Sequence, residues 1–297
     1  MDRQNERNHK EVFFPGQHLK FHELRERIRN VYLNRYQHIP RSPDPVEFHV
    51  SNLRHDTCYS SFQAIMRDGG FKKPGPEVTS AKSLVWWSLA VSEDDIAEAE
   101  CRFLQYFKMI EDCKPFLRKF TSSPAFRKSS RMGNFRFTFS LRGLLANYKA
   151  QFCMGQEPQI RIYETVVYKQ EVMYSIVVHG PAAQNDFGKY PLLQDSRANA
   201  VCLFQGENIL WRPEGMSKTH AFRLVMGEEV LARRVLRRKR QFYAWDHVAV
   251  AFHVPQGKTF KFDHGTLRSH LSLCQGAELN LSNEEFIQCD FEALLTQ

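Results

Sequence analysis

The sequence predicts an α+β protein in which a mixed, mostly antiparallel sheet is flanked by helices and preceded by an N-terminal helical appendage. Apolar residues recur at helical spacing mainly in the first 110 residues, whereas strand-like alternation dominates after Phe135. No internal repeat interrupts this order. The strongest linker-like stretch is the proline-rich segment 40–45. We therefore expect a tail and an amphipathic helix over residues 1–45, and a single α+β domain over residues 46–297.

The N-terminal appendage begins with residues 1–16, which are polar and predict a disordered tail. Residues 18–37 then have the spacing of an amphipathic helix. Three prolines between residues 40 and 45 end this helix, because proline and the residue before it disfavour helical backbone. The apolar face of the helix comprises Leu24, Ile28, Val31 and Tyr32.

Two strand–helix units follow. Residues 46–53 alternate as a strand, and Tyr59–Asp68 has helical spacing that ends at Gly69, where glycine suits a left-handed helix cap. Leu84–Val91 predicts a strand that is apolar enough to be buried on both faces. A second helix begins after Ser92, which has Asp95 three residues later as the partner in a capping box.

The second half of the chain predicts mainly strands. A polar loop is expected over residues 121–134, and a helix over residues 283–295 is expected near the end of the sequence. The strands between them are expected at 135–139, at 160–179 as two strands joined near Lys169, at 201–211 as a hairpin turning at Gly206–Asn208, and at 221–225 and 242–254.

Composition limits the class of protein. The fractions of hydrophobic (42%) and charged (25%) residues are those of a globular protein, and 24 Phe residues predict an aromatic core. The longest apolar runs, such as Val248–Phe252, are far shorter than the roughly 18–20 residues of a spanning helix. The N-terminus is polar, without the apolar stretch of a signal peptide. We therefore expect a cytoplasmic or nuclear protein with no membrane partner.

Cysteine and histidine spacing argues against a metal or disulfide framework. The seven cysteines are odd in number and form no Cys-x-x-Cys pair, which favours reduced thiols. The twelve histidines include no His-Glu-x-x-His arrangement. We expect no bound metal.

The net charge of +8 is concentrated in one basic block. Three interpretations remain open: a nuclear-import signal, a nucleic-acid or phosphate-binding patch, and a solvated helix end that begins at Glu228 and Glu229. The candidate phosphate-binding residues are Arg233, Arg234, Arg237, Arg238, Lys239 and Arg240.

Three stretches of sequence carry a resemblance to a known family. Residues 48–57 read as a strand ending in His55-Asp56-Thr57, and the helix after them closes on a Gly-Phe pair. Leu84–Ser92 is an aromatic strand, and Glu164–Tyr168 is a late strand that opens with a carboxylate. Together they resemble the ADP-ribosyltransferase fold of the poly-ADP-ribose polymerases, with Asp56 where that family has glycine in its His-Gly-Thr turn.

The resemblance implies a chemistry that uses NAD as cofactor. Glu164 would be the catalytic acid, because a carboxylate stabilises the oxocarbenium-like centre formed when the bond between nicotinamide and ribose breaks. His55 would hold a ribose hydroxyl and fix the pose of the sugar. Aromatic faces would stack on nicotinamide. The implied cofactor-binding residues are Thr57, Tyr59, Trp86, Trp87 and Ser88.

Other interpretations of the same residues remain open. An alternative alignment takes residues 242–248 as the late strand, which moves the acid position to Asp246. Glu164 is then an ordinary carboxylate paired with Arg161, and Trp86 and Trp87 are packing residues on opposite faces of one strand.

The sequence therefore leaves two main functions. One is an intracellular ADP-ribosyltransferase-like effector, active or inactive, with a protein or RNA acceptor. The other is a non-catalytic basic module that binds nucleic acid or protein, with cations for phosphates and neighbouring aromatics for bases. In general style the chain also resembles the virus- and interferon-induced defence proteins of fish, which implies an antiviral role in innate immunity.

Overall fold

The computed structural model describes residues 1–5, 9–34, 46–73, 83–106, 117–120, 123–194, 201–215, 221–226, 231–236 and 244–274. Its elements in chain order are β1 (Asp2–Gln4), β2 (Lys10–Pro15), α1 (Phe21–Arg27), α2 (Val31–Asn34), β3 (Phe48–Val50), β4 (Asn52–Thr57), α3 (Tyr59–Asp68), β5 (Gly70–Phe71), β6 (Leu84–Leu89), α4 (Glu93–Tyr106), the 3-10 turns η2 (Leu117–Phe120) and η3 (Pro124–Phe126), β7 (Phe135–Ser140), α5 (Leu141–Phe152), β8 (Gln159–Tyr168), β9 (Glu171–His179), η4 (Pro181–Ala183), α6 (Gln184–Phe187), β10 (Cys202–Gln205), β11 (Asn208–Trp211), β12 (Ala221–Met226), β13 (Leu231–Leu236), β14 (Trp245–His253), β15 (Phe260–Lys261), α7 (His264–Ser269) and β16 (Leu271–Leu273).

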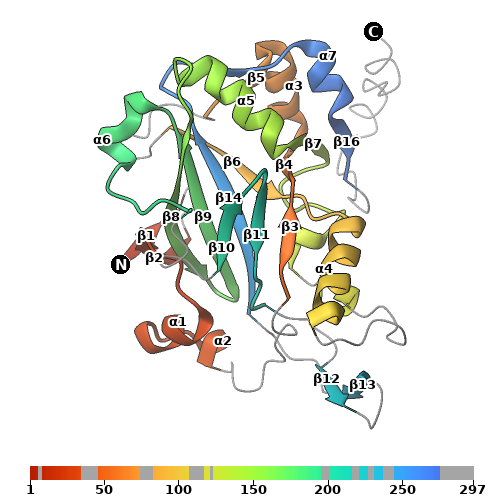
Figure 1. Cartoon of the computed structure of the whole chain (residues 1–297). Helices are drawn as coiled ribbons and strands as arrows, with labels where there is room; N and C mark the ends of the chain where they lie inside the picture. Colours follow the sequence, from red (N-terminus) through yellow and green to blue (C-terminus); the bar gives the residue numbers. More distant parts are fainter. Residues whose placement is uncertain are drawn as a thin grey trace.

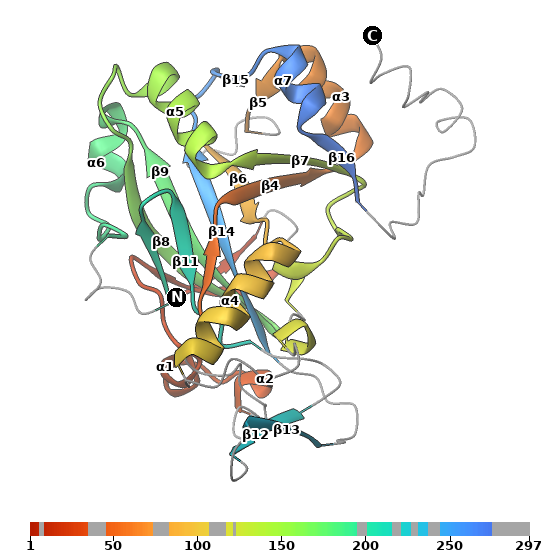
Figure 2. The ribbon, with the colours of Figure 1, turned by 45° about the vertical axis from the view of Figure 1, so that its right-hand side comes forward.

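A nine-stranded sheet organises the molecule, in the order β1-β2-β8-β9-β14-β6-β4-β7-β16. Its neighbouring strands are antiparallel except for β9 and β14, which run parallel. A smaller sheet of order β10-β11-β3 lies in front of the centre of the large sheet in Figure 1. Helices α3, α5 and α7 gather at the upper end in both Figure 1 and Figure 2. The α+β class with a mixed, mostly antiparallel sheet is therefore confirmed.

The core is aromatic, as the phenylalanine content predicts. Burying a large aromatic side chain removes about 150–250 Å² from water, so each contributes strongly to stability. The largest fully buried side chains include Trp87, Trp211, Tyr148, Tyr174, Phe21, Phe71, Phe103, Phe137, Phe187, Phe252 and Phe260.

The predicted disorder of residues 1–16 is wrong for the part that the structure describes. β1 pairs with β2, and β2 pairs with β8 from Val12↔Val167 to Pro15↔Glu164. Phe14 packs against the main core, so a segment that reads as polar still has apolar residues on one face of the strand. The N-terminal segment therefore forms the edge of the large sheet.

The helix predicted over 18–37 begins later, at Phe21, and is broken in two within the described residues, and positions 35–37 lie outside them. Helix α1 ends at Arg27. The next residue, Ile28, is extended, with a ψ of 145°, and α2 begins at Val31. The side chain of Asn30 accepts hydrogen bonds from the backbone N–H groups of Tyr32 (2.9 Å) and Leu33 (3.1 Å), so it caps the start of α2.

Several local predictions are confirmed. Helix α3 has the predicted bounds, and Gly69 adopts the left-handed conformation (φ 65°) that the C-cap requires. Ser92 and Asp95 exchange hydrogen bonds between side chain and backbone at the start of α4. Strands β8 and β9 meet at Lys169, whose φ is 53°, and β10 and β11 turn at Gly206.

Other elements differ from the predictions. The strand expected at 46–53 divides at Ser51, because β3 joins the small sheet whereas β4 joins the large one. Strand β6 is not buried on both faces, since Trp86 is 36% exposed. Helix α5 interrupts the expected run of strands; it is capped by the Ser140 side chain, which accepts from Gly143 N, and buries Leu144 and Tyr148. The helix expected at 283–295 lies outside the described residues.

Among the described helices, none is long and apolar enough to cross a lipid bilayer.

Candidate functional site

The two residues implied as catalytic lie on strands that are not neighbours. Glu164 is on β8 and His55 is on β4, and the strand order places β9, β14 and β6 between them. With strands about 4.8 Å apart, four spacings separate the two by roughly 19 Å. The structure therefore does not bring Glu164 and His55 together around one bound sugar.

Glu164 is buried in an ion pair with the N-terminal strand. It is 3% exposed, and its two carboxylate oxygens accept hydrogen bonds from Arg3 Nη1 (2.8 Å) and Nη2 (2.7 Å). Arg3 Nε also donates to Glu11 (2.6 Å), and its guanidinium lies 4.5 Å from the centre of the Phe13 ring. Burial alone lowers the pKa of Arg3, but the hydrogen bonds and charges of the two glutamates outweigh it and raise that pKa.

The expected pairing of Glu164 with Arg161 is wrong. Arg161 Nε donates to His179 Nε2 (2.9 Å), and its Nη1 donates to the Tyr190 carbonyl (2.7 Å). The other ring nitrogen of His179 donates to the Gly180 carbonyl (2.9 Å), so the ring is neutral, and burial lowers its pKa.

His55 is held within an aromatic cluster. Its Nδ1 lies 2.8 Å from the carbonyl oxygen of Trp86 and donates to it, since a carbonyl only accepts. The imidazole lies 5.1 Å from the Phe71 ring centre and 5.4 Å from that of Trp87. Burial lowers the pKa of His55, which keeps the ring neutral at pH 7.

The residues implied to bind the cofactor divide between two faces of the large sheet. Trp87 is 2% exposed and lies in the core beside His55, as its packing interpretation predicts. Trp86 is on the opposite face, where its ring lies 6.4 Å from that of Tyr163. Thr57 is buried, and Tyr59 and Ser88 are half-buried on α3 and β6.

Asp246, the alternative acid, is fully buried on β14. Its carboxylate accepts from the backbone N–H groups of Glu214 (3.0 Å) and Gly215 (2.6 Å). Burial raises its pKa to about 7. A Cβ at position 215 would lie 2.5 Å from Asp246 Oδ1, so only glycine allows this approach. Asp246 therefore ties two segments together and is closed to solvent.

Two further charged clusters were missed by the sequence interpretation. The Glu171 carboxylate accepts hydrogen bonds from His247 Nε2 (2.8 Å) and Arg131 Nη2 (2.5 Å). Burial alone would raise the pKa of Glu171, but these two partners outweigh it and lower that pKa to about 2. Asp56 accepts two hydrogen bonds from Arg136 at 2.7 and 2.9 Å. The alternation Phe135-Arg136-Phe137 in β7 is the signal that indicates a charged residue on the more exposed face of the sheet.

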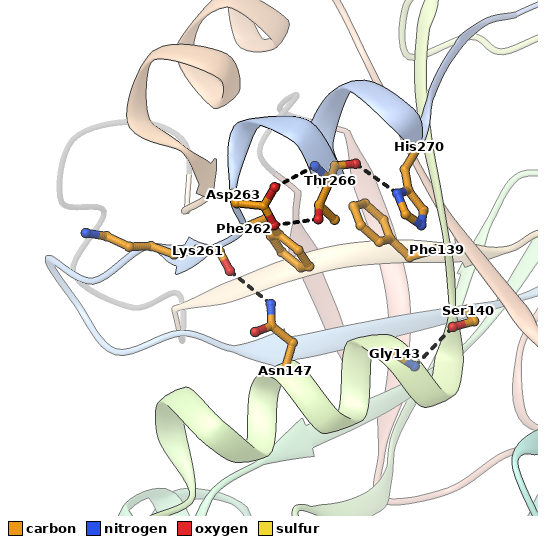
Figure 3. Close-up of a pocket in the computed structure, with 9 residues that line it drawn as sticks. All are labelled: Phe139, Ser140, Gly143, Asn147, Lys261, Phe262, Asp263, Thr266 and His270. Carbon is orange, nitrogen blue, oxygen red and sulfur yellow. Dashed lines mark hydrogen bonds between the residues drawn. The ribbon is translucent and has the colours of Figure 1, made fainter.

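A cavity of about 540 Å³ is lined by residues of β7, α5 and α7 and of the segment from β15 to α7. These elements gather at the upper end of the molecule in Figure 2. None of the residues implied by the resemblance lines the cavity. Figure 3 shows its lining residues, which are Phe139, Ser140, Gly143, Asn147, Lys261, Phe262, Asp263, Thr266 and His270.

The basic block is on a strand where the structure describes it. Arg233 and Arg234 belong to β13, so the helix-end interpretation is wrong for residues 231–236, and Arg237 to Arg240 lie outside the described residues. β12 and β13 form a separate two-stranded ribbon, which lies below the large sheet in Figures 1 and 2.

Within the part of the chain that the structure describes, no three His, Cys, Asp or Glu side chains gather in a way that would hold a metal ion. Comparisons of the chain with protein-family models, with curated proteins and with solved structures find no match.

Proposed function

We propose that the protein is a non-catalytic interaction module that binds single-stranded nucleic acid through the β12–β13 ribbon and the basic residues after it. The observation that carries this proposal is the distribution of charge. Residues 216–243 contain eight Lys or Arg residues and two Glu residues, a net charge of +6 out of +8 for the whole chain. Such a concentration of cations attracts phosphates and releases the counterions bound to them.

The register of the ribbon supports an anionic partner. Arg223 lies directly opposite Arg234 in the antiparallel pair, and Arg233 lies opposite Leu224. Like charges in directly opposed positions destabilise a strand pair. A phosphate chain along the ribbon offsets this repulsion, and the aromatic residues from 242 to 245 supply stacking surfaces for bases close by in the chain.

The contacts of the implied catalytic residues support a non-catalytic role. Glu164 accepts two hydrogen bonds from Arg3, and His55 donates its Nδ1 proton to a backbone carbonyl. Each group is engaged in a separate structural contact, on strands that do not adjoin. Fold resemblance alone does not confer activity, because activity depends on the geometry of the site.

Fluorescence anisotropy with a labelled single-stranded RNA of about 20 nucleotides tests the proposal. We expect the affinity to fall steeply between about 50 and 200 mM salt. The double variant Arg233→Gln/Arg234→Gln should reduce the slope of log K against log salt by about 1, because consecutive residues of a strand belong to opposite faces and one of the two contacts the bound strand. The matched control, Lys128→Gln/Lys258→Gln, removes the same charge from exposed positions elsewhere. Equal slopes for the two double variants would refute the proposal.

The second candidate function is the one implied by the resemblance: an ADP-ribosyltransferase-like effector of innate antiviral defence that binds NAD or ADP-ribose. A ligand that binds only the folded state raises its stability, so millimolar NAD would raise the melting temperature even at a weak site. The wild type and Glu164→Ala are compared with both ligands. A rise in the wild type that is lost in the variant favours this function, and no rise with either ligand removes it.

A further inference from the structure

The cavity between α5 and α7 has the size and lining of a small-molecule site, and it is built from residues that the proposed function does not use. Its volume of about 540 Å³ lies within the range of roughly 300–1,000 Å³ that is common for ligand pockets. Three rings form one wall in Figure 3, and Asn147 of α5 projects toward them from below.

The aromatic wall is ordered by stacking. Phe139 is 4% exposed, and the His270 ring lies parallel to it, with centroids 4.2 Å apart and an interplanar angle of 6°. Phe262 tilts against Phe139 at 4.8 Å. Phe262 is only half-buried, so it retains surface for a further flat ring, and His270 is half-buried at the end of the wall.

The proton of the His270 imidazole is placed by its neighbours. Nδ1 lies 2.8 Å from the Thr266 carbonyl oxygen, which can only accept, so Nδ1 carries the proton. In the neutral ring Nε2 is then a hydrogen-bond acceptor. The pocket therefore presents a defined acceptor at one end of its aromatic wall.

The amide of Asn147 is also oriented. Its Oδ1 accepts from Gln151 Nε2 (2.9 Å), and its Nδ2 donates to the Lys261 carbonyl (2.9 Å). An amide nitrogen has two N–H groups, so a second N–H remains for a ligand. The Asp263 carboxylate accepts hydrogen bonds from both the backbone N–H and the hydroxyl of Thr266. The carboxylate is therefore engaged in capping the start of α7.

We propose that this pocket binds a neutral, planar heteroaromatic ring that carries both a hydrogen-bond donor and an acceptor. The ring stacks on Phe262, gives an N–H to His270 Nε2 in the plane of the imidazole, and accepts from Asn147. Nucleobases and carboxamide-substituted pyridines share this chemistry.

Titration calorimetry with adenosine and with nicotinamide tests the proposal and separates the two sources. The variant His270→Phe keeps the ring that stacks on Phe139 but deletes the acceptor, and we expect at least an approximately fivefold weaker affinity for whichever compound binds. His264→Phe is the matched control, because His264 is exposed on the same helix and does not line the pocket. An equal affinity for His270→Phe and wild type, or no binding of either compound to wild type, would overturn the proposal.

Amide NMR of the wild-type protein gives a test that does not depend on the folding of a variant. The ligand should shift the backbone N–H signals of Gly143 and Thr266 in the pocket and leave that of Lys169, in the β8–β9 turn, unchanged. The variant Arg233→Gln/Arg234→Gln should bind the compound as the wild type does, since this site does not depend on the basic ribbon. Shifts confined to other regions would contradict the proposal.

Discussion

The ion pair between Arg3 and Glu164 connects the N-terminal hairpin to the centre of the fold, and removing either partner should have unequal costs. Glu164→Ala deletes the buried anion, whose side chain is 4% exposed, and leaves a cation whose side chain is 34% exposed. Arg3 keeps its contact with Glu11 in that variant. Arg3→Ala instead leaves two buried carboxylates, those of Glu164 and Glu11, without their charge partner.

The magnitudes follow from which charge is left behind. Breaking a buried ion pair costs about 3–5 kcal/mol when the remaining charge stays buried. We therefore expect Arg3→Ala to lower the free energy of unfolding by about 3–5 kcal/mol. Glu164→Ala should cost about 2 kcal/mol, since the remaining guanidinium reaches solvent and a second carboxylate. In the double variant both charges of the Arg3–Glu164 pair are gone and Glu11 alone has lost its cation, so the cost should fall short of the sum by about 1–3 kcal/mol.

Urea unfolding of the wild type, the two single variants and the double variant at pH 7 measures the cycle. Additive costs within about 0.5 kcal/mol, or a larger cost for Glu164→Ala than for Arg3→Ala, would refute the reasoning.

Three further predictions concern buried carboxylates. Burial raises the pKa of Asp246 from 3.8 to about 7, so the folded state binds the proton more tightly than the unfolded state and loses on the order of 4 kcal/mol of stability as the pH rises from about 4 to 7. Asp246→Asn should remove this fall of the unfolding free energy with pH, as measured by urea unfolding. An unchanged pH dependence would contradict the raised pKa of Asp246. Glu171 has a pKa of about 2 in the folded state against an ordinary 4.5, so its stabilisation of about 3 kcal/mol is present above pH 4.5 and is lost as the pH falls toward 2. Glu171→Gln should therefore make the acid-unfolding transition, followed by circular dichroism, less steep than in the wild type. An equally steep transition would argue against the pair with His247. Gly215→Ala should lower the free energy of unfolding by about 1–3 kcal/mol, measured by thermal unfolding, because the new methyl group would overlap Asp246. A variant as stable as the wild type would show that Gly215 and Asp246 are not in such close contact.

The candidate site illustrates how far sequence patterns reach. Gly69 ends α3 and Ser92 starts α4 through bonds within one helical turn, so the residue types nearby suffice to predict them. The pocket between α5 and α7 was not predicted, because Phe139 and His270 stack although 131 positions separate them in the sequence. Helix α5 itself was missed, although Ser140 followed by Leu141 and Leu144 is a local capping and spacing signal.

By itself the sequence determined the α+β class, the aromatic core, the bounds of α3, the turn between β8 and β9 and the concentration of charge near residue 234. These features depend on backbone propensity, side-chain periodicity and composition, which act over a few residues. Only the tertiary structure decided that Arg3 pairs with Glu164, 161 positions away, and that three strands separate Glu164 from His55. Strand order follows from which apolar faces pack together across the whole chain, and that is a property of no single segment.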